Sequence, residues 1–208
     1  MPHDDFDVEP IPGLPEVLPK GEEILWRGRP QTWALALDAM NLGWVAGYFA
    51  LLTVWRFVSV VDLMPLPQAF AAALPMVMVG AVACLLLLVM AWAQARATIY
   101  TVTTARVVMR VGAALNLTLN LPYSQVSNAV LDLRKRGTGT IAFETMGKTR
   151  LSIFAIWPHA RPWRFNPTQP ALRCIPDAAR VAAIVSDAAE ARVSMPQVAR
   201  VPEAVAAE

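Results

Sequence analysis

The sequence predicts an α+β membrane protein in which two transmembrane helices are followed by an antiparallel β-barrel or sandwich with a C-terminal helix. Two strongly apolar intervals between residues 38 and 96 predict the membrane helices. Short segments rich in β-branched residues follow them and predict strands, and one amphipathic helical pattern closes the series. Of the 208 residues 56% are apolar and 16% are charged, a balance that excludes a disordered chain and disfavours a soluble one.

Residues 1–33 form a proline-rich, acidic segment. Seven acidic residues precede Ile24, and prolines stand at positions 10, 12, 15 and 19. The segment has no basic region followed by a cleavable apolar stretch, so we expect no signal peptide. It is expected to be cytoplasmic and extended, and either lies along a partner or is a flexible tail.

Residues 34–96 are predicted to form a two-helix transmembrane hairpin. The first span runs from about Met40 to Val61, with Arg56 close enough to its far end to reach the headgroups. The second span runs from about Leu74 to Ala95. Prolines 65, 67 and 75 predict a turn or interfacial segment over residues 62–73. A short or re-entrant third membrane segment there is the alternative.

The basic residues predict the orientation of this hairpin. Of the 18 lysines and arginines, fourteen lie between Arg96 and Arg200, three lie in residues 1–33, and Arg56 alone lies near the connecting loop. Because basic residues are retained on the cytoplasmic side, we expect both termini in the cytoplasm and the protein in the bacterial inner or intracytoplasmic membrane. Trp33 and Trp55 fit opposite interfaces, and Trp92 fits the cytoplasmic end of the second span.

Two glycines in the first span form a GxxxG pattern, Gly43 and Gly47. This pattern allows helices to approach closely in lipid, so we expect helix packing there. The partner is either the second span or a second copy of the chain, which would give a homodimer. The second span contains no charged residue, which argues against a transporter or a proton relay.

Residues 97–192 are predicted to form one β domain with a C-terminal helix. The expected strands are 97–104, 106–112, 115–121, 124–134, 140–145 and 150–157. A proline-rich connection, residues 158–176, follows them. A helix over 177–192 then presents Val181, Ile184, Val185 and Ala188 on one stripe. This element order is that of a pleckstrin-homology (PH)-like barrel, and residues 193–208 are expected to be a flexible tail.

The residues that carry chemistry are few. Two cysteines, Cys84 and Cys174, and two histidines, His3 and His159, provide no disulfide framework and no metal site. No HExxH, CxxC or phosphate-loop motif is present. We therefore expect no enzymatic activity, no cofactor and no nucleic-acid partner. Neither histidine can lie within a span, which disfavours a histidine-ligated pigment.

The remaining candidates are surfaces. Arg134, Lys135 and Arg136 form a basic triplet that is either a solvated turn or a contact with anionic lipid headgroups. A second candidate combines aromatic and guanidinium groups in a proline-stiffened segment, and either contacts a partner or the membrane, or packs the last helix onto the barrel. Its members are Trp157, Arg161, Trp163 and Arg164.

Four segments resemble the bacterial PH-domain membrane proteins, namely EILWRGRP, YTVTTARVVMRVG, LPYSQVSNAVLDL and GTGTIAFE. Two further regions are similar to the photosynthetic complex assembly proteins of purple bacteria, the PuhB type. These are PIPGLPEVLPKGEEILWRGRP at residues 10–30, and WPHARPWRF with ALRCIPDAARVA within residues 157–183. The resemblance implies a non-enzymatic membrane protein that is needed to assemble the reaction centre with its light-harvesting 1 antenna.

Two functional hypotheses follow. In the first, the protein is a scaffold whose partners are reaction-centre and light-harvesting 1 subunits or other assembly factors, together with membrane lipids. In the second, it is a lipid-sensing or envelope-maintenance protein unrelated to photosynthesis. If it acts by binding, His159→Ala alone should leave assembly nearly intact. Joint replacement of Trp157, Arg161, Trp163 and Arg164 by alanine should lower the amount of assembled complex.

Overall fold

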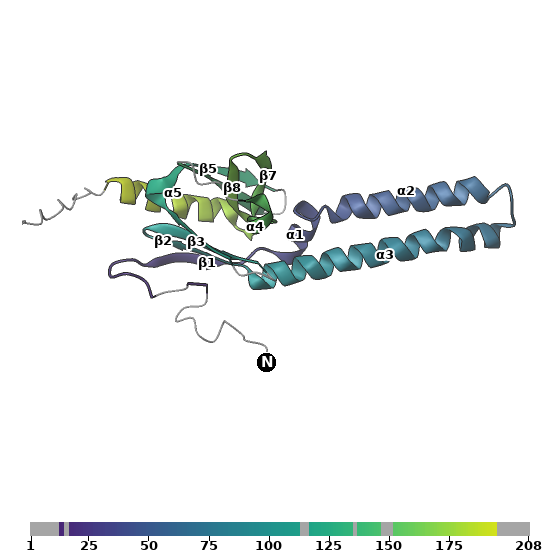
Figure 1. The fold of residues 1–208 in the computed structure, drawn as a ribbon, viewed down its shortest axis with the longest axis horizontal. Coiled ribbons are helices and arrows are strands. Elements are labelled where there is room, and N and C mark those ends of the chain that lie inside the picture. Colours follow the sequence, from purple (N-terminus) through teal and green to yellow (C-terminus); the bar gives the residue numbers. More distant parts are fainter. Residues whose placement is uncertain (1–12, 15–16, 113–116, 135–136, 147–151, 195–208) are drawn as a thin grey trace, which may run out of the picture.

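The protein consists of a long helical hairpin joined to a β domain (Figure 1). The computed structural model describes residues 13–14, 17–112, 117–134, 137–146 and 152–194. The helices are α1 (Thr32–Asp38), α2 (Leu42–Val60), α3 (Leu66–Ala97), α4 (Ile153–Ile156) and α5 (Ala178–Ser194), with a 3-10 turn, η1, at Tyr123–Gln125. The strands are β1 (Ile24–Gly28), β2 (Ile99–Thr103), β3 (Arg106–Val111), β4 (Leu117–Pro122), β5 (Val126–Leu133), β6 (Thr138–Thr145), β7 (Ala160–Phe165) and β8 (Thr168–Pro176).

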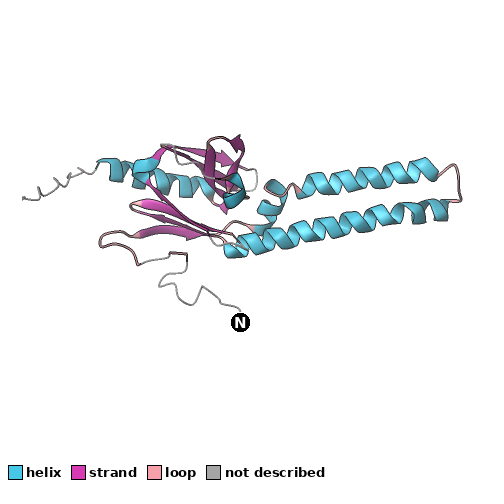
Figure 2. Ribbon diagram, in the orientation of Figure 1, coloured by secondary structure: helices cyan, strands magenta, loops and turns pink. Residues whose placement is uncertain are grey.

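The hairpin consists of α2 and α3, which project away from the β domain (Figure 2). Both helices are long and apolar enough to cross a membrane, and almost none of their residues is buried inside the protein. An apolar helix that its own chain leaves uncovered requires an apolar solvent, because exposing such a surface to water is unfavourable. This distinguishes the pair from the core helices of a soluble protein.

The connection between the two helices is shorter than expected. α3 begins at Leu66, with Pro65 as its N-cap and Pro67 in the first turn, where a missing N–H costs nothing. Pro75 lies inside the helix and does not end it. The prediction of a turn or interfacial segment over residues 62–73 is therefore wrong for residues 66–73, which belong to α3. Within the described chain this region contains no third membrane segment, because α3 is one continuous helix.

Close packing of α2 on α3 involves a glycine other than the predicted pair. A Cβ atom added to Gly80 of α3 would lie 2.7 Å from Cβ of Phe49 of α2, so the helices approach closely there. A Cβ atom added to Gly43 or Gly47 would meet nothing within 4 Å. The prediction that these two glycines pack the first span against the second is therefore wrong. Their contact with a second copy remains a prediction.

The β domain contains a strand that precedes the membrane hairpin. β1 pairs antiparallel with β2, which follows α3 directly, and the first sheet has the order β1-β2-β3-β4. Glu22, next to β1, accepts two hydrogen bonds from the Arg106 guanidinium at 2.8 and 3.0 Å. The predicted boundary at residue 33 therefore does not separate the N-terminal segment from the domain. Residues 1–12 lie outside the described chain.

The second sheet contains two strands that the sequence did not reveal. Its order is β5-β6-β8-β7, with antiparallel pairing throughout. β7 and β8 occupy the region predicted as a proline-rich connection, so that prediction is wrong. The strand expected at 150–157 is also wrong, because Ile153–Ile156 is the short helix α4. Residues 147–151 and the tail after Ser194 lie outside the described residues.

The core of the domain lies between the two sheets and α5. Side chains of β2, β3 and β6 face one stripe of α5, in which Val181, Val185 and Ala188 are buried. The predicted stripe on the C-terminal helix is thus confirmed. The alternation predicted for β4 is confirmed as well, since Thr118 and Asn120 are exposed between less exposed leucines. The architecture is that of a PH-like β domain with a C-terminal helix.

The β domain is joined to the hairpin by a packed junction. Leu35 of α1 and Ala39, the C-cap residue of that helix, pack with Ala95 of α3 and Cys174 of β8. The backbone N–H of Gln31 donates to the carbonyl of Cys174 at 2.8 Å. Since α3, α1 and β8 all meet here, the junction fixes the orientation of the domain relative to the two apolar helices.

Candidate functional site

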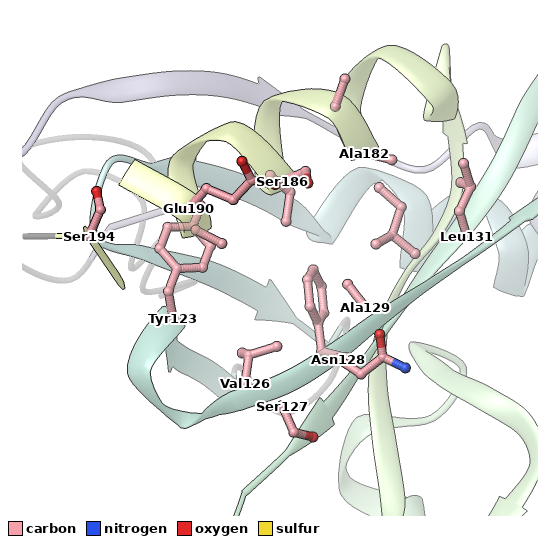
Figure 3. A pocket seen from close by; sticks show the side chains of 15 residues that line it. Tyr123, Val126, Ser127, Asn128, Ala129, Leu131, Ala182, Ser186, Glu190 and Ser194 are labelled. Atoms are coloured by element: carbon pink, nitrogen blue, oxygen red, sulfur yellow. Dashed lines mark hydrogen bonds between the residues drawn. The ribbon is translucent and has the colours of Figure 1, made fainter. Parts of the chain in front are cut away.

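A groove of about 750 Å³ opens between α5 and the edge strand β5 (Figure 3). Ala182 and Ser186 of α5 line one side, and Val126 and Ala129 of β5 line the other. Tyr123 stands at the end of the groove next to Ser194. Because α5 presents small residues to this side, it covers only part of the apolar interior of the domain.

The chemistry of the groove suits binding of an extended apolar segment. Ile141 and Phe143 contribute apolar surface, and the polar lining residues are serines, Asn128 and Glu190. β5 is the outermost strand of its sheet in the described chain, so one side of its backbone has no neighbouring strand. A free strand edge beside an apolar groove can accept a further strand and the side chains of its inner face. The sequence analysis did not predict this site. The row of small residues on the predicted last helix could have indicated it, because small side chains leave space between a helix and a sheet.

The four aromatic and arginine candidates differ in how far they are exposed. Trp163 of β7 is 87% exposed and Arg164 is exposed beside it, whereas Trp157 is 45% exposed. Arg161 is held within the domain, since its Nη1 donates to Oε1 of Gln169 at 3.0 Å and lies 3.9 Å from Glu144. Trp157, Trp163 and Arg164 are thus exposed, with Trp163 the most exposed, whereas Arg161 is held by its neighbours.

His159 is a buried structural residue. Its Nδ1 lies 2.6 Å from the hydroxyl of Tyr100, and its Nε2 lies 3.0 Å from Oγ1 of Thr98. Burial lowers the pKa of His159 to about 3, and the nearby Arg173 charge acts in the same direction. The imidazole is thus neutral at physiological pH and connects the first residues after α3 to the start of β7.

The basic triplet is described only in part. Arg134 follows β5 and lies 3.6 Å from Asp38 and 3.9 Å from Asp132, with its side chain about half exposed. Lys135 and Arg136 lie outside the described residues. The pairing of Arg134 with two carboxylates favours a role in holding the end of β5 near α1.

The two cysteines lie on different elements and are both free thiols. Cys84 lies in the middle of α3, and Cys174 is buried in β8, where burial raises the pKa of its thiol to about 11. Among the described residues, no three His, Cys, Asp or Glu side chains gather in a way that would hold a metal ion.

Comparisons with known proteins agree with this architecture. The profile of the family described as "Bacterial PH domain" matches residues 39–189. A protein of Rhodobacter capsulatus, described as "Uncharacterized 23.7 kDa protein in puhA 5'region", is 45% identical over 213 residues, which cover 100% of this chain and 98% of that protein. No solved structure matches the chain significantly.

Proposed function

Because the chain belongs to the bacterial PH-domain family, we propose that it is a non-catalytic membrane scaffold that assembles the photosynthetic reaction centre with its light-harvesting 1 antenna. In this role α2 and α3 anchor the protein in the cytoplasmic membrane, and the β domain presents binding surfaces to newly inserted subunits. Reaction-centre subunits, light-harvesting 1 subunits and other assembly factors are the proposed partners.

The observation that carries the proposal is the packed junction between the helices and the β domain. Leu35 of α1 and Ala95 of α3 are both buried against Cys174 of β8. Arg173 adds two hydrogen bonds, from Nη1 to the carbonyl of Pro158 at 3.2 Å and from Nη2 to the carbonyl of Asp38 at 3.0 Å. A domain held in this way keeps its surfaces at a fixed height and angle relative to the bilayer, as a scaffold requires.

The photosynthetic context is supported by the relative from Rhodobacter capsulatus, a purple bacterium. The description of that relative says that it is encoded in the 5' region of puhA. This agrees with the resemblance of residues 10–30 and 157–183 to the assembly proteins of purple bacteria. The assembly role itself is the proposed step.

The proposed orientation has both termini in the cytoplasm. β1 precedes the hairpin and β2 follows it, and the two strands pair directly. This pairing supports a topology in which the chain leaves and returns on one side of the membrane. The excess of basic residues after Arg96 supports the cytoplasmic side.

The groove between α5 and β5 is the proposed binding site for a partner subunit. Ser186→Trp would fill the groove, since Ser186 is exposed and lines it. Asp187→Trp is the matched control, because Asp187 is the neighbouring exposed residue and does not line the groove. Both substitutions leave the buried stripe of α5 unchanged.

The test is affinity purification of the tagged full chain from growing pigmented cells, with mass spectrometry of the proteins that follow it. We expect reaction-centre or light-harvesting 1 subunits with the wild type and with Asp187→Trp, and several-fold less of them with Ser186→Trp. Equal recovery with both variants would exclude the groove. Absence of these subunits from all three samples would contradict the assembly role and favour a lipid-sensing or envelope-maintenance protein.

A further inference from the structure

Three exposed tryptophans lie on elements that meet at the membrane end of the β domain. Trp33 of α1 is 52% exposed, Trp92 of α3 is 54% exposed and Trp163 of β7 is 87% exposed. The bond between His159 and Thr98 holds the start of β7 beside the last residues of α3. Figure 1 shows β7 and α4 at the end of the β domain next to α1 and the helical hairpin.

Trp163 combines an unfavourable backbone conformation with an exposed side chain. Trp163 has φ +62°, in the left-handed region that a bulky side chain rarely adopts. Its indole is almost fully exposed, so packing within the described protein does not offset that unfavourable conformation. A strained residue with an exposed side chain is typical of a binding surface.

Cationic side chains accompany two of these tryptophans. The Arg96 guanidinium lies 5.7 Å from the centre of the Trp92 ring, and Arg164 is exposed directly after Trp163. Tryptophan and arginine together are typical of the level at which a protein meets lipid headgroups, because the indole is amphipathic and the guanidinium pairs with phosphate.

We infer that the outer edge of β7, with Trp163 and Arg164, rests on the anionic headgroups of the leaflet that α2 and α3 enter. β7 is an edge strand of its sheet in the described chain, so no further strand covers its outer edge. Lipid is the occupant that fits best, because β7 lies at the end of the β domain next to α1 and the helical hairpin, and tryptophan and arginine are the residue types of the headgroup level. The inference depends on the proposed membrane insertion and on no partner subunit.

The test measures tryptophan fluorescence of the purified full chain in nanodiscs of phosphatidylglycerol, with ordinary chains or with chains brominated near the headgroup. The emission of Trp163 is obtained as the difference between the wild type and Trp163→Phe. We expect bromination to reduce that emission about twofold or more, because the indole lies at the interface. Trp26→Phe gives the control difference, since Trp26 is partly buried against the core of the β domain. The emission of Trp26 should stay unchanged.

Each outcome decides the inference. Quenching of the total emission but not of the Trp163 fraction would show that the helices insert and that β7 does not touch lipid. In that case β7 is a surface for a protein partner and the inference is overturned. Absence of any quenching would overturn membrane insertion as well. Discs of neutral phosphatidylcholine should give weaker quenching of Trp163, and the same should hold for Arg164→Gln in phosphatidylglycerol. Equal quenching in both lipids would overturn the role of anionic headgroups.

Discussion

The hydroxyl of Tyr100 lies 2.6 Å from Nδ1 of His159, at the point where the β domain meets the end of α3. The same hydroxyl accepts the backbone N–H of Arg173 at 3.3 Å. All groups are satisfied when Tyr100 donates to Nδ1 and the proton on Nε2 is donated to Thr98. The imidazole and the Tyr100 hydroxyl together therefore connect β2 with β8 and with the residue that precedes β7.

His159→Ala should destabilise the β domain. The substitution leaves the buried Tyr100 hydroxyl and the Thr98 hydroxyl without this partner, at a cost of about 3 kcal/mol. The expectation from sequence concerned assembly and not stability: that His159→Ala alone leaves assembly nearly intact remains a prediction, to be measured on variants that still fold. Thermal unfolding of the full chain in detergent measures the loss, with Tyr100→Phe as a milder control. An unchanged midpoint would contradict the network.

Stability should fall at acidic pH because of the same residue. The pKa of His159 is lowered from 6.5 to about 3 in the folded protein. Between these values the unfolded chain binds a proton that the folded chain excludes, so stability present above pH 6.5 is lost as the pH falls. The slope approaches about 1.4 kcal/mol per pH unit. Denaturation at several pH values checks this against His159→Gln, which should lack that part of the slope; equal slopes would be inconsistent with a neutral buried imidazole.

Arg173→Met should loosen the junction between the helices and the β domain. Methionine fills similar space but leaves the carbonyls of Asp38 and Pro158 without their donor. Hydrogen exchange of the Gln31 amide, which donates to Cys174, should accelerate about tenfold because local opening becomes easier. Arg180→Met is the control, since Arg180 is exposed on α5. Equal exchange rates of the Gln31 amide in the two variants would show that Arg173 does not stabilise the junction.

Gly80→Val should disturb the packing of α2 on α3. Its Cβ atom would lie 2.7 Å from Cβ of Phe49, which cannot move away without shifting the helix, and we expect a cost of about 2 kcal/mol. Gly47→Val is the control, because a Cβ atom there meets nothing within 4 Å. Thermal denaturation of the helical signal in detergent compares the two variants. Chemical crosslinking of Gly47→Val in membranes separately tests whether that face binds a second copy.

Trp163→Gly should be more stable than Trp163→Ala. Both variants remove the indole, but only glycine adopts φ +62° without a Cβ clash, which is worth about 1 kcal/mol. The midpoint of chemical denaturation measures the difference. If alanine proved equal to or better than glycine, the backbone at this position would not be strained.

Much of the fold is encoded in local patterns. The charge-free intervals predicted both long helices, and the alternation of Leu117, Leu119 and Leu121 with polar residues predicted β4. The stripe on α5 was also visible, because amphipathic periodicity is a property of neighbouring residues. These elements form the hairpin and part of the core.

The errors lie where pairing between distant segments overrides local pattern. Pro162 and Pro170 argue against strands, yet β7 is an edge strand and its pairing with β8 is irregular, which tolerates proline. The sequence around β1 has no pattern that predicts a strand. β1 is stabilised by pairing with β2, which follows the entire helical hairpin, and a local pattern does not record such a distant partner. The groove arises only when α5 is placed across the sheet, and no sequence motif describes such a space.

The pairing of β1 with β2 also sets the order of events during biosynthesis. β1 leaves the ribosome before the two apolar helices, and β2, its neighbour among the described strands of the first sheet, leaves after them. With the membrane insertion proposed above, the sheet would stay open until α3 has returned the chain to the starting side. A chain in which α3 failed to integrate would keep an unpaired strand and an incomplete core. Cellular proteases that degrade unfolded domains would then remove the misinserted molecules.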